Sequence, residues 1–63
     1  MKIKELRLAA DLTQTQLAGI LGVTQSQVAA WERGANYPNA QKLPALAKAL
    51  GVTINDLYKS ESA

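Results

Sequence analysis

The sequence predicts an all-α domain of five short helices, and three patterns along the chain favour this fold class. In the first, an apolar residue precedes a threonine and Gln or Asp follows three positions later, as in a helix N-cap with its capping box. This pattern occurs three times, with its threonines at Thr13, Thr24 and Thr53. In the second, a glycine suited to a left-handed C-terminal cap follows a helix-like apolar segment, at Gly22, Gly34 and Gly51. In the third, no segment alternates apolar and polar residues as a half-buried strand would.

The first three helices follow in chain order. Residues 2–10 are expected to form the first helix, because Ile3, Leu6 and Ala10 share one face. The second and third helices start directly after their threonine caps and are expected to run over residues 14–21 and 25–33.

The fourth helix ends before Gly51 and carries apolar residues at helical spacing, namely Leu43, Leu46, Ala47 and Leu50. Its start is open, because Pro44 is tolerated only in a first turn: the helix begins near Leu43, or a looser turn from Asn39 precedes it. The fifth helix is short, over residues 54–58. Its Leu57 and Tyr58 either close the core or form a small self-association patch. The domain is expected to span residues 1–58, and residues 59–63 are expected to be a frayed tail.

Composition excludes several classes of function. The chain has 63 residues, with no cysteine and no histidine. A domain this short buries only about 60% of its unfolded surface, which leaves little room for an internal active-site cavity. Without thiols or imidazoles there is no zinc site, disulfide framework or imidazole base, so neither a metal nor another cofactor is expected. The carboxylates, Glu5, Asp11, Glu32, Asp56 and Glu61, are spread over different elements, which argues against an enzyme.

Charge and hydropathy point to a soluble protein with a mild preference for anionic partners. The net charge is +2, and charged residues make up 19% of the chain. No apolar run approaches the roughly 20 residues that cross a bilayer, and the N-terminus lacks the pattern of a secretion signal. The cytoplasm is therefore the expected compartment, and no small-molecule ligand is indicated.

The segment between the second and third helices indicates a helix-turn-helix. A connection as short as Gly22-Val23-Thr24 forces consecutive helices to cross steeply. Ala18 is small where the third helix must approach, and Gly22 permits the positive φ of the turn. The residues expected to form the core of this unit are Leu17, Ala18, Leu21, Gly22, Val23, Val28 and Trp31.

The outer side of the third helix is the candidate reading surface. At about 100° per residue, Val28 and Trp31 share the inner side, and the outer side receives Gln25, Ser26, Ala29, Ala30 and Arg33. A glutamine amide can pair with adenine N6 and N7, a serine hydroxyl can bind a base edge, and an alanine methyl can contact a thymine methyl.

Phosphate contacts must come largely from neutral groups. No charged residue lies between Leu12 and Trp31, so amides, hydroxyls and helix N-terminal N–H groups would face the phosphates. Gln14, at the start of the second helix, suits this role. Charge neutralisation then depends on Arg33, Lys42 and the N-terminal lysines, which predicts a shallow salt dependence.

These residues also carry a family resemblance that spans nearly the whole chain. The matching pieces are Leu12-Thr13-Gln14, Leu17-Ala18, Leu21-Gly22-Val23-Thr24, Val28, Trp31-Glu32-Arg33-Gly34, Pro38 and the segment from Leu46 to Val52. In their order and spacing they resemble the phage repressor and Cro (Xre-like) helix-turn-helix family. The resemblance implies a compact lambda-repressor-like fold and a sequence-specific transcriptional regulator that docks as a homodimer, at least on DNA, on a partly palindromic operator.

Position by position, the resemblance implies roles for further residues. Base contact falls to Gln25, Ser26 and the site of Ala30, where an alanine replaces the longer polar residue often found there. Arg7 and Glu32 match an ion pair that bridges the first and third helices. Contact with the DNA backbone falls to Gln14, Gln27, Asn36 and Tyr37. The loop that carries Asn36 and Tyr37 lacks the basic residues of many relatives.

A second class of function is open at this stage. The same fold can serve as an antitoxin-like module that binds a protein partner, with DNA binding secondary, and the weak charge of the chain favours it. Such a module normally has a longer partner-binding tail than the few residues after Tyr58.

Overall fold

The computed structural model describes residues 1–58, which form five α-helices. Their bounds are α1 Ile3–Ala9, α2 Gln14–Leu21, α3 Gln25–Glu32, α4 Leu43–Leu50 and α5 Ile54–Tyr58. The all-α prediction is confirmed, and the predicted bounds of α1, α2, α3 and α5 agree with these to within one residue at each end. The tail predicted for residues 59–63 lies outside the described residues.

The helix starts follow the chemistry of the caps. At Thr13 and Thr24, each threonine hydroxyl accepts a hydrogen bond from the backbone N–H three residues on, and the side-chain oxygen of the glutamine at that position accepts one from the threonine N–H. Thr53 and Asp56 form the same reciprocal pair, at 3.0 and 3.2 Å. These bonds satisfy N–H groups that have no partner within the helix, which is why α2, α3 and α5 begin where they do.

The start of α4 combines the two possibilities that the sequence left open. The helix begins at Leu43 with Pro44 in its first turn. A turn precedes it, in which the Lys42 N–H donates to both the side-chain and the main-chain oxygen of Asn39, at 3.1 and 3.0 Å.

The turn after α1 departs from the glycine pattern. Asp11 has a φ of 59°, in the left-handed region, and is the one residue other than glycine with a positive φ among those described. The turn closes through the N–H groups of Asp11 and Leu12, which donate to the carbonyls of Leu8 and Arg7 at 3.0 and 3.1 Å. Aspartate tolerates this conformation better than most residues, so the turn forms without glycine at a small energetic cost.

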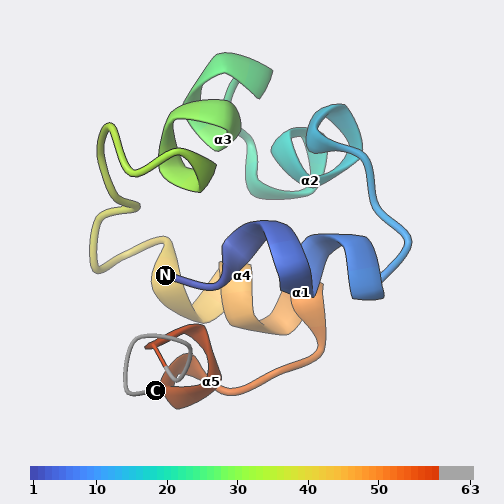
Figure 1. Ribbon diagram of the computed structural model, residues 1–63, viewed down its shortest axis with the longest axis vertical. Coiled ribbons are helices and arrows are strands. Elements are labelled where there is room, and N and C mark those ends of the chain that lie inside the picture. The colour runs from blue at the N-terminus through green and yellow to red at the C-terminus, as the bar shows by residue number, and fades with distance from the viewer. Residues whose placement is uncertain (59–63) are drawn as a thin grey trace.

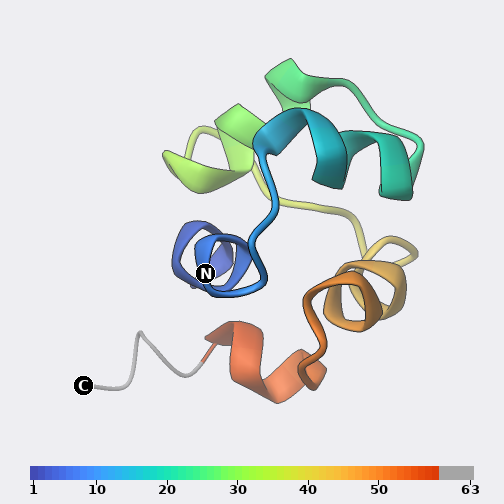
Figure 2. The same ribbon diagram turned by 90° about the vertical axis from the view of Figure 1, so that its right-hand side faces the viewer.

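The helices are arranged in three tiers. Helices α1 and α4 lie at the same level in the middle, α2 and α3 lie on one side of this level, and α5 lies on the other (Figures 1 and 2). The backbone N–H of Lys2 donates to the carbonyl of Leu57 at 2.8 Å, which ties the N-terminus to α5.

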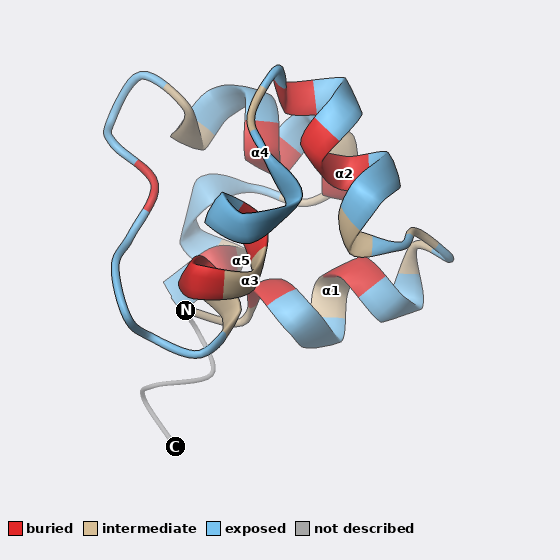
Figure 3. Ribbon diagram, turned by 90° about the horizontal axis from the view of Figure 1, so that it is seen from above, coloured by how far each residue is buried: buried red, intermediate tan, exposed pale blue. Residues whose placement is uncertain are grey.

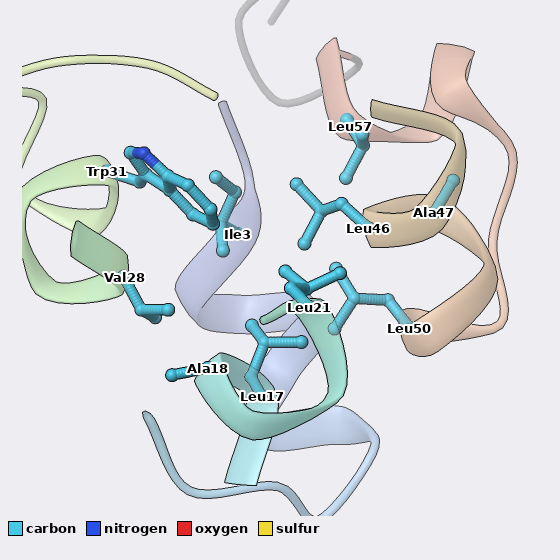
Figure 4. Close-up of a cluster of buried hydrophobic side chains, with 10 residues drawn as sticks. All are labelled: Ile3, Leu17, Ala18, Leu21, Val28, Trp31, Leu46, Ala47, Leu50 and Leu57. Atoms are coloured by element: carbon cyan, nitrogen blue, oxygen red, sulfur yellow. The ribbon is translucent and has the colours of Figure 1, made fainter. Parts of the chain in front are cut away.

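One hydrophobic core joins the three tiers (Figure 4). It draws side chains from every helix, namely Ile3, Leu17, Ala18, Leu21, Val28, Trp31, Leu46, Ala47, Leu50 and Leu57. Leu57 is fully buried and closes this core, whereas Tyr58 beside it is 44% exposed. Because α2 and α3 contribute half of the set, the core sets the angle at which α3 faces outward.

Candidate nucleic-acid interface

The turn between α2 and α3 holds the two helices in a fixed crossing. Gly22 adopts the left-handed conformation, with a φ of 70°, and its N–H and that of Val23 both donate to the carbonyl of Ala18. Two residues later the Thr24 hydroxyl accepts from the Gln27 N–H at 3.2 Å, and the Thr24 N–H donates to the Gln27 side-chain oxygen at 2.9 Å. The turn therefore ends one helix and starts the next within three residues.

The two sides of α3 differ in exposure (Figure 3). Val28 and Trp31 are 0% and 6% exposed and pack into the core. Gln25 and Ser26 are exposed in the first turn of α3, and Ala29 is half-buried one turn later. A neutral amide and a hydroxyl thus project from the helix, while an aliphatic side chain and an indole fix it from behind.

The structure corrects the predicted position of Ala30. The helical projection places Ala30 on the outer side, but the residue is 8% exposed and therefore buried. The projection considers α3 alone and does not include the rest of the fold, in which the Ala35 N–H donates to the Ala30 carbonyl at 2.9 Å. Little of the Ala30 surface is therefore open to a base.

A chain of hydrogen bonds runs from α1 to the exposed end of α3. Arg7 donates through Nε to Glu32 Oε2 at 2.6 Å and through Nη2 to Glu32 Oε1 at 3.1 Å. Gln14 donates to the same Glu32 Oε1 at 3.1 Å and accepts a bond from the Gln25 amide, also at 3.1 Å. The position of the Gln25 side chain is thus coupled, through Gln14, to an ion pair at the opposite end of α3.

The ion pair removes a negative charge from the candidate surface. The side chains of Arg7 and Glu32 are only 8% and 5% exposed, and Arg7 also donates through Nη1 to the Leu12 carbonyl at 2.7 Å. Burial alone raises the pKa of Glu32, but hydrogen bonds from Arg7 and Gln14 and the charges of Arg7 and Lys4 outweigh it, so the pKa is lowered. The bond to Glu32 raises the pKa of Arg7 despite its burial. Glu32, the acidic residue of α3, is therefore ionised but covered and neutralised.

The exposed loop after α3 forms one wall of a polar hollow, called here the loop hollow. Its volume is about 260 Å³, and it is lined by Val23, Gln27, Trp31, Asn36, Tyr37, Asn39 and Lys42. Gln27, Asn36, Tyr37 and Lys42, which the sequence analysis assigned to phosphate contact, therefore meet around one concave surface. Arg33 and Gln14 lie outside this lining.

Besides Gln27, whose side-chain oxygen accepts from the Thr24 N–H in the cap of α3, two of the predicted phosphate contacts have partners within the protein. Gln14 is half-buried and engaged in the hydrogen bonds described above. The ammonium of Lys42 donates to the carbonyl of Leu21 at 2.9 Å. Sequence reasoning missed both, because the partners lie 18 and 21 residues away and no local pattern links them.

Within residues 1–58, no group of acidic side chains is placed to hold a metal ion. Over the same residues, the helices are all too short or too polar to span a bilayer.

Comparison with known proteins links this geometry to a family. The family described as Helix-turn-helix matches residues 3–57. The chain is 40% identical over 60 residues to the HTH-type transcriptional activator BcrR of Enterococcus faecalis, covering 95% of this chain and 29% of that protein. It is 38% identical over 56 residues to the cryptic phage CTXphi transcriptional repressor RstR of Vibrio cholerae, covering 89% of this chain and 50% of that protein. The chain thus spans half or less of the length of these relatives. No solved structure matches it.

Proposed function

Because the chain belongs to the helix-turn-helix family, we propose that it binds double-stranded DNA sequence-specifically and acts as a repressor-like transcription regulator. In this proposal α3 enters the major groove, as the second helix of such units does. The observation that carries it is the two-sidedness of α3: Gln25 and Ser26 face solvent while Val28 and Trp31 anchor the helix in the core. The names of both relatives, an activator and a repressor of transcription, support regulation over catalysis.

Base recognition is assigned to the first two turns of α3. The Gln25 amide suits adenine, which offers N7 as an acceptor and N6 as a donor, and Ser26 suits any base edge within reach. Ala29 is half-buried and offers a methyl to thymine. The bond from Gln25 to Gln14 restricts the Gln25 side chain before DNA arrives, which lowers the entropy lost on binding.

Phosphate contacts are assigned to both flanks of α3. Gln14 lies on one flank, while Gln27, Asn36 and Tyr37 lie around the loop hollow on the other. Arg33 follows α3 and is exposed, so its charge is available to a phosphate. Because most of these groups are neutral, the affinity should depend less steeply on salt than that of a lysine-rich domain.

We further propose that two copies bind a palindromic site. Half-sites one helical turn apart place the two domains about 34 Å apart. The longest dimension of the domain is 29 Å, so neighbouring copies at this spacing meet only at their edges. A small contact of this kind favours pairing on DNA over pairing in free solution. Binding to chromosomal DNA would place the protein in the cytoplasm.

The test is selection of bound oligonucleotides from a random pool, followed by fluorescence anisotropy with the selected sequence and a scrambled one at the same salt concentration. The selected site should bind at least about a thousandfold more tightly. Gln25→Ala should weaken the free energy of binding to the selected sequence by about 1–3 kcal/mol and relax the sequence preference at one base pair. Gln41→Ala, an exposed loop glutamine outside the proposed contacts, is the matched control and should bind normally. Equal affinity for both sequences would refute specific binding and favour a protein-interaction module.

A further inference from the structure

Lys42 links two parts of the proposed interface that are far apart in the sequence. It is the last residue before α4, and its ammonium reaches the carbonyl of Leu21, the last residue of α2, at 2.9 Å. The last carbonyls of a helix have no partner within it, so this bond satisfies one of them. A cation is also favoured there, because the helix dipole is negative at its C-terminal end.

This bond closes the loop hollow at one end. The loop between α3 and α4 is anchored at its start by the Ala35 N–H, which donates to the Ala30 carbonyl at 2.9 Å. Its far end is held by Lys42 against the end of α2, next to the turn that leads into α3. Gln27 on α3, Asn36 on the loop and Lys42 itself all line the loop hollow.

The Lys42 charge lies in a partly buried position within the protein. The side chain is half-buried, and its hydrogen bond to Leu21 is partly buried as well. An ammonium bound to a helix end in this way is engaged in a hydrogen bond within its own protein. The guanidinium of Arg33, in contrast, is exposed and available to a partner.

We propose that Lys42 is a positioning residue of the DNA interface, and this inference rests on the function proposed above. Its ammonium holds the loop after α3 against the end of α2, so that Gln27, Asn36 and Tyr37 stay arranged around one hollow. Lys42 contributes to DNA affinity through this arrangement and does not neutralise a phosphate itself. This assignment replaces the direct phosphate contact that the sequence analysis predicted for Lys42.

The test compares Lys42→Met with Arg33→Met, each of which removes one positive charge and keeps an aliphatic stem. Affinity for the selected DNA site is measured over a range of salt concentrations, at a temperature where circular dichroism shows each variant to be folded. Lys42→Met should weaken binding about five- to tenfold on selected and scrambled DNA alike, with the salt slope of the wild type. Arg33→Met should reduce that slope by about 0.9, the value for one phosphate contact.

A second measurement does not need DNA. Amide hydrogen exchange of the free protein should be faster in Lys42→Met at Val23 and at position 42, whose N–H groups lie at the two segments that the ammonium joins, and unchanged in Arg33→Met. A salt slope reduced by about one in Lys42→Met, unchanged exchange, or unchanged DNA affinity in a folded variant would each overturn the positioning role. Absence of DNA binding by the wild type would refute the proposed function and this role on DNA, while the exchange data would still report whether Lys42 anchors the loop.

Discussion

Replacing Arg7 with methionine should destabilise the domain strongly at neutral pH. Methionine keeps most of the aliphatic stem but removes the guanidinium, which donates to Glu32 at 2.6 and 3.1 Å and to the Leu12 carbonyl at 2.7 Å. The variant retains a Glu32 side chain that is only 5% exposed in the intact pair, with the Gln14 amide as its remaining side-chain donor. A buried carboxylate would then lack its counter-charge.

The expected magnitude is large for a domain of this size. Removing one partner of a buried ion pair costs about 3–5 kcal/mol, because the other charge stays buried. A chain of 63 residues is stabilised by roughly 3–9 kcal/mol in total, at about 0.05–0.15 kcal/mol per residue. Arg7→Met should therefore lower the thermal midpoint by more than about 10 °C.

The dependence on pH distinguishes this mechanism from a loss of packing. In the wild type the pKa of Glu32 is lowered, so its contribution to stability is present above the unfolded pKa and is lost as pH falls through the folded pKa. Without Arg7, burial dominates and raises the pKa of Glu32, so the penalty is present at neutral pH and disappears as the carboxylate is protonated. As the pH falls from 7 to 5, the difference in unfolding free energy between wild type and the variant should therefore become smaller.

The assay is thermal unfolding followed by circular dichroism over this pH range. The double variant Arg7→Met with Glu32→Met removes both charges and should recover most of the lost stability. Arg33→Met removes an exposed arginine and should change the free energy of unfolding by no more than about 0.5 kcal/mol. If Arg7→Met were as stable as wild type at pH 7, or lost stability in parallel with it on acidification, the buried-pair reasoning would be wrong.

Three further tests address the local structure by thermal unfolding. Thr24→Ala removes the cap of α3 and should lower the free energy of unfolding by about 1 kcal/mol. Thr15→Ala, at an exposed position inside α2, should leave this free energy unchanged or raise it. Equal effects of the two substitutions would show that the cap does not stabilise α3. Gly19→Ala should stabilise α2 by about 0.5–1 kcal/mol because an added Cβ meets open space, whereas Gly22→Ala should cost about 1–2 kcal/mol because its φ is 70°. A stabilised Gly22→Ala would contradict the strain argument. Asp11→Gly should raise the free energy of unfolding by about 0.5–1 kcal/mol, because it relieves a φ of 59° and removes a negative charge beyond the C-terminal end of α1. A measured loss of stability would show that the aspartate side chain stabilises the turn.

The helices and their ends could be predicted because their causes are local. A threonine cap and its glutamine are three residues apart, and an apolar stripe repeats every three or four residues, so a short segment contains the whole pattern. The burial of Val28 and Trp31, and hence the outward side of the first turn of α3, followed from the same periodicity. The family resemblance rested on these same features.

What only the tertiary structure decided are the contacts between segments distant in sequence. The burial of Ala30 departs from the helical periodicity of α3, and the hydrogen bond of Lys42 depends on where α4 places its first turn against α2. The resemblance already implied the Arg7–Glu32 pair, but its extension through Gln14 to Gln25 requires three helices to be packed together. Long polar side chains such as these can reach many partners, and the choice among them is set by the packing of the core, which a linear pattern does not contain.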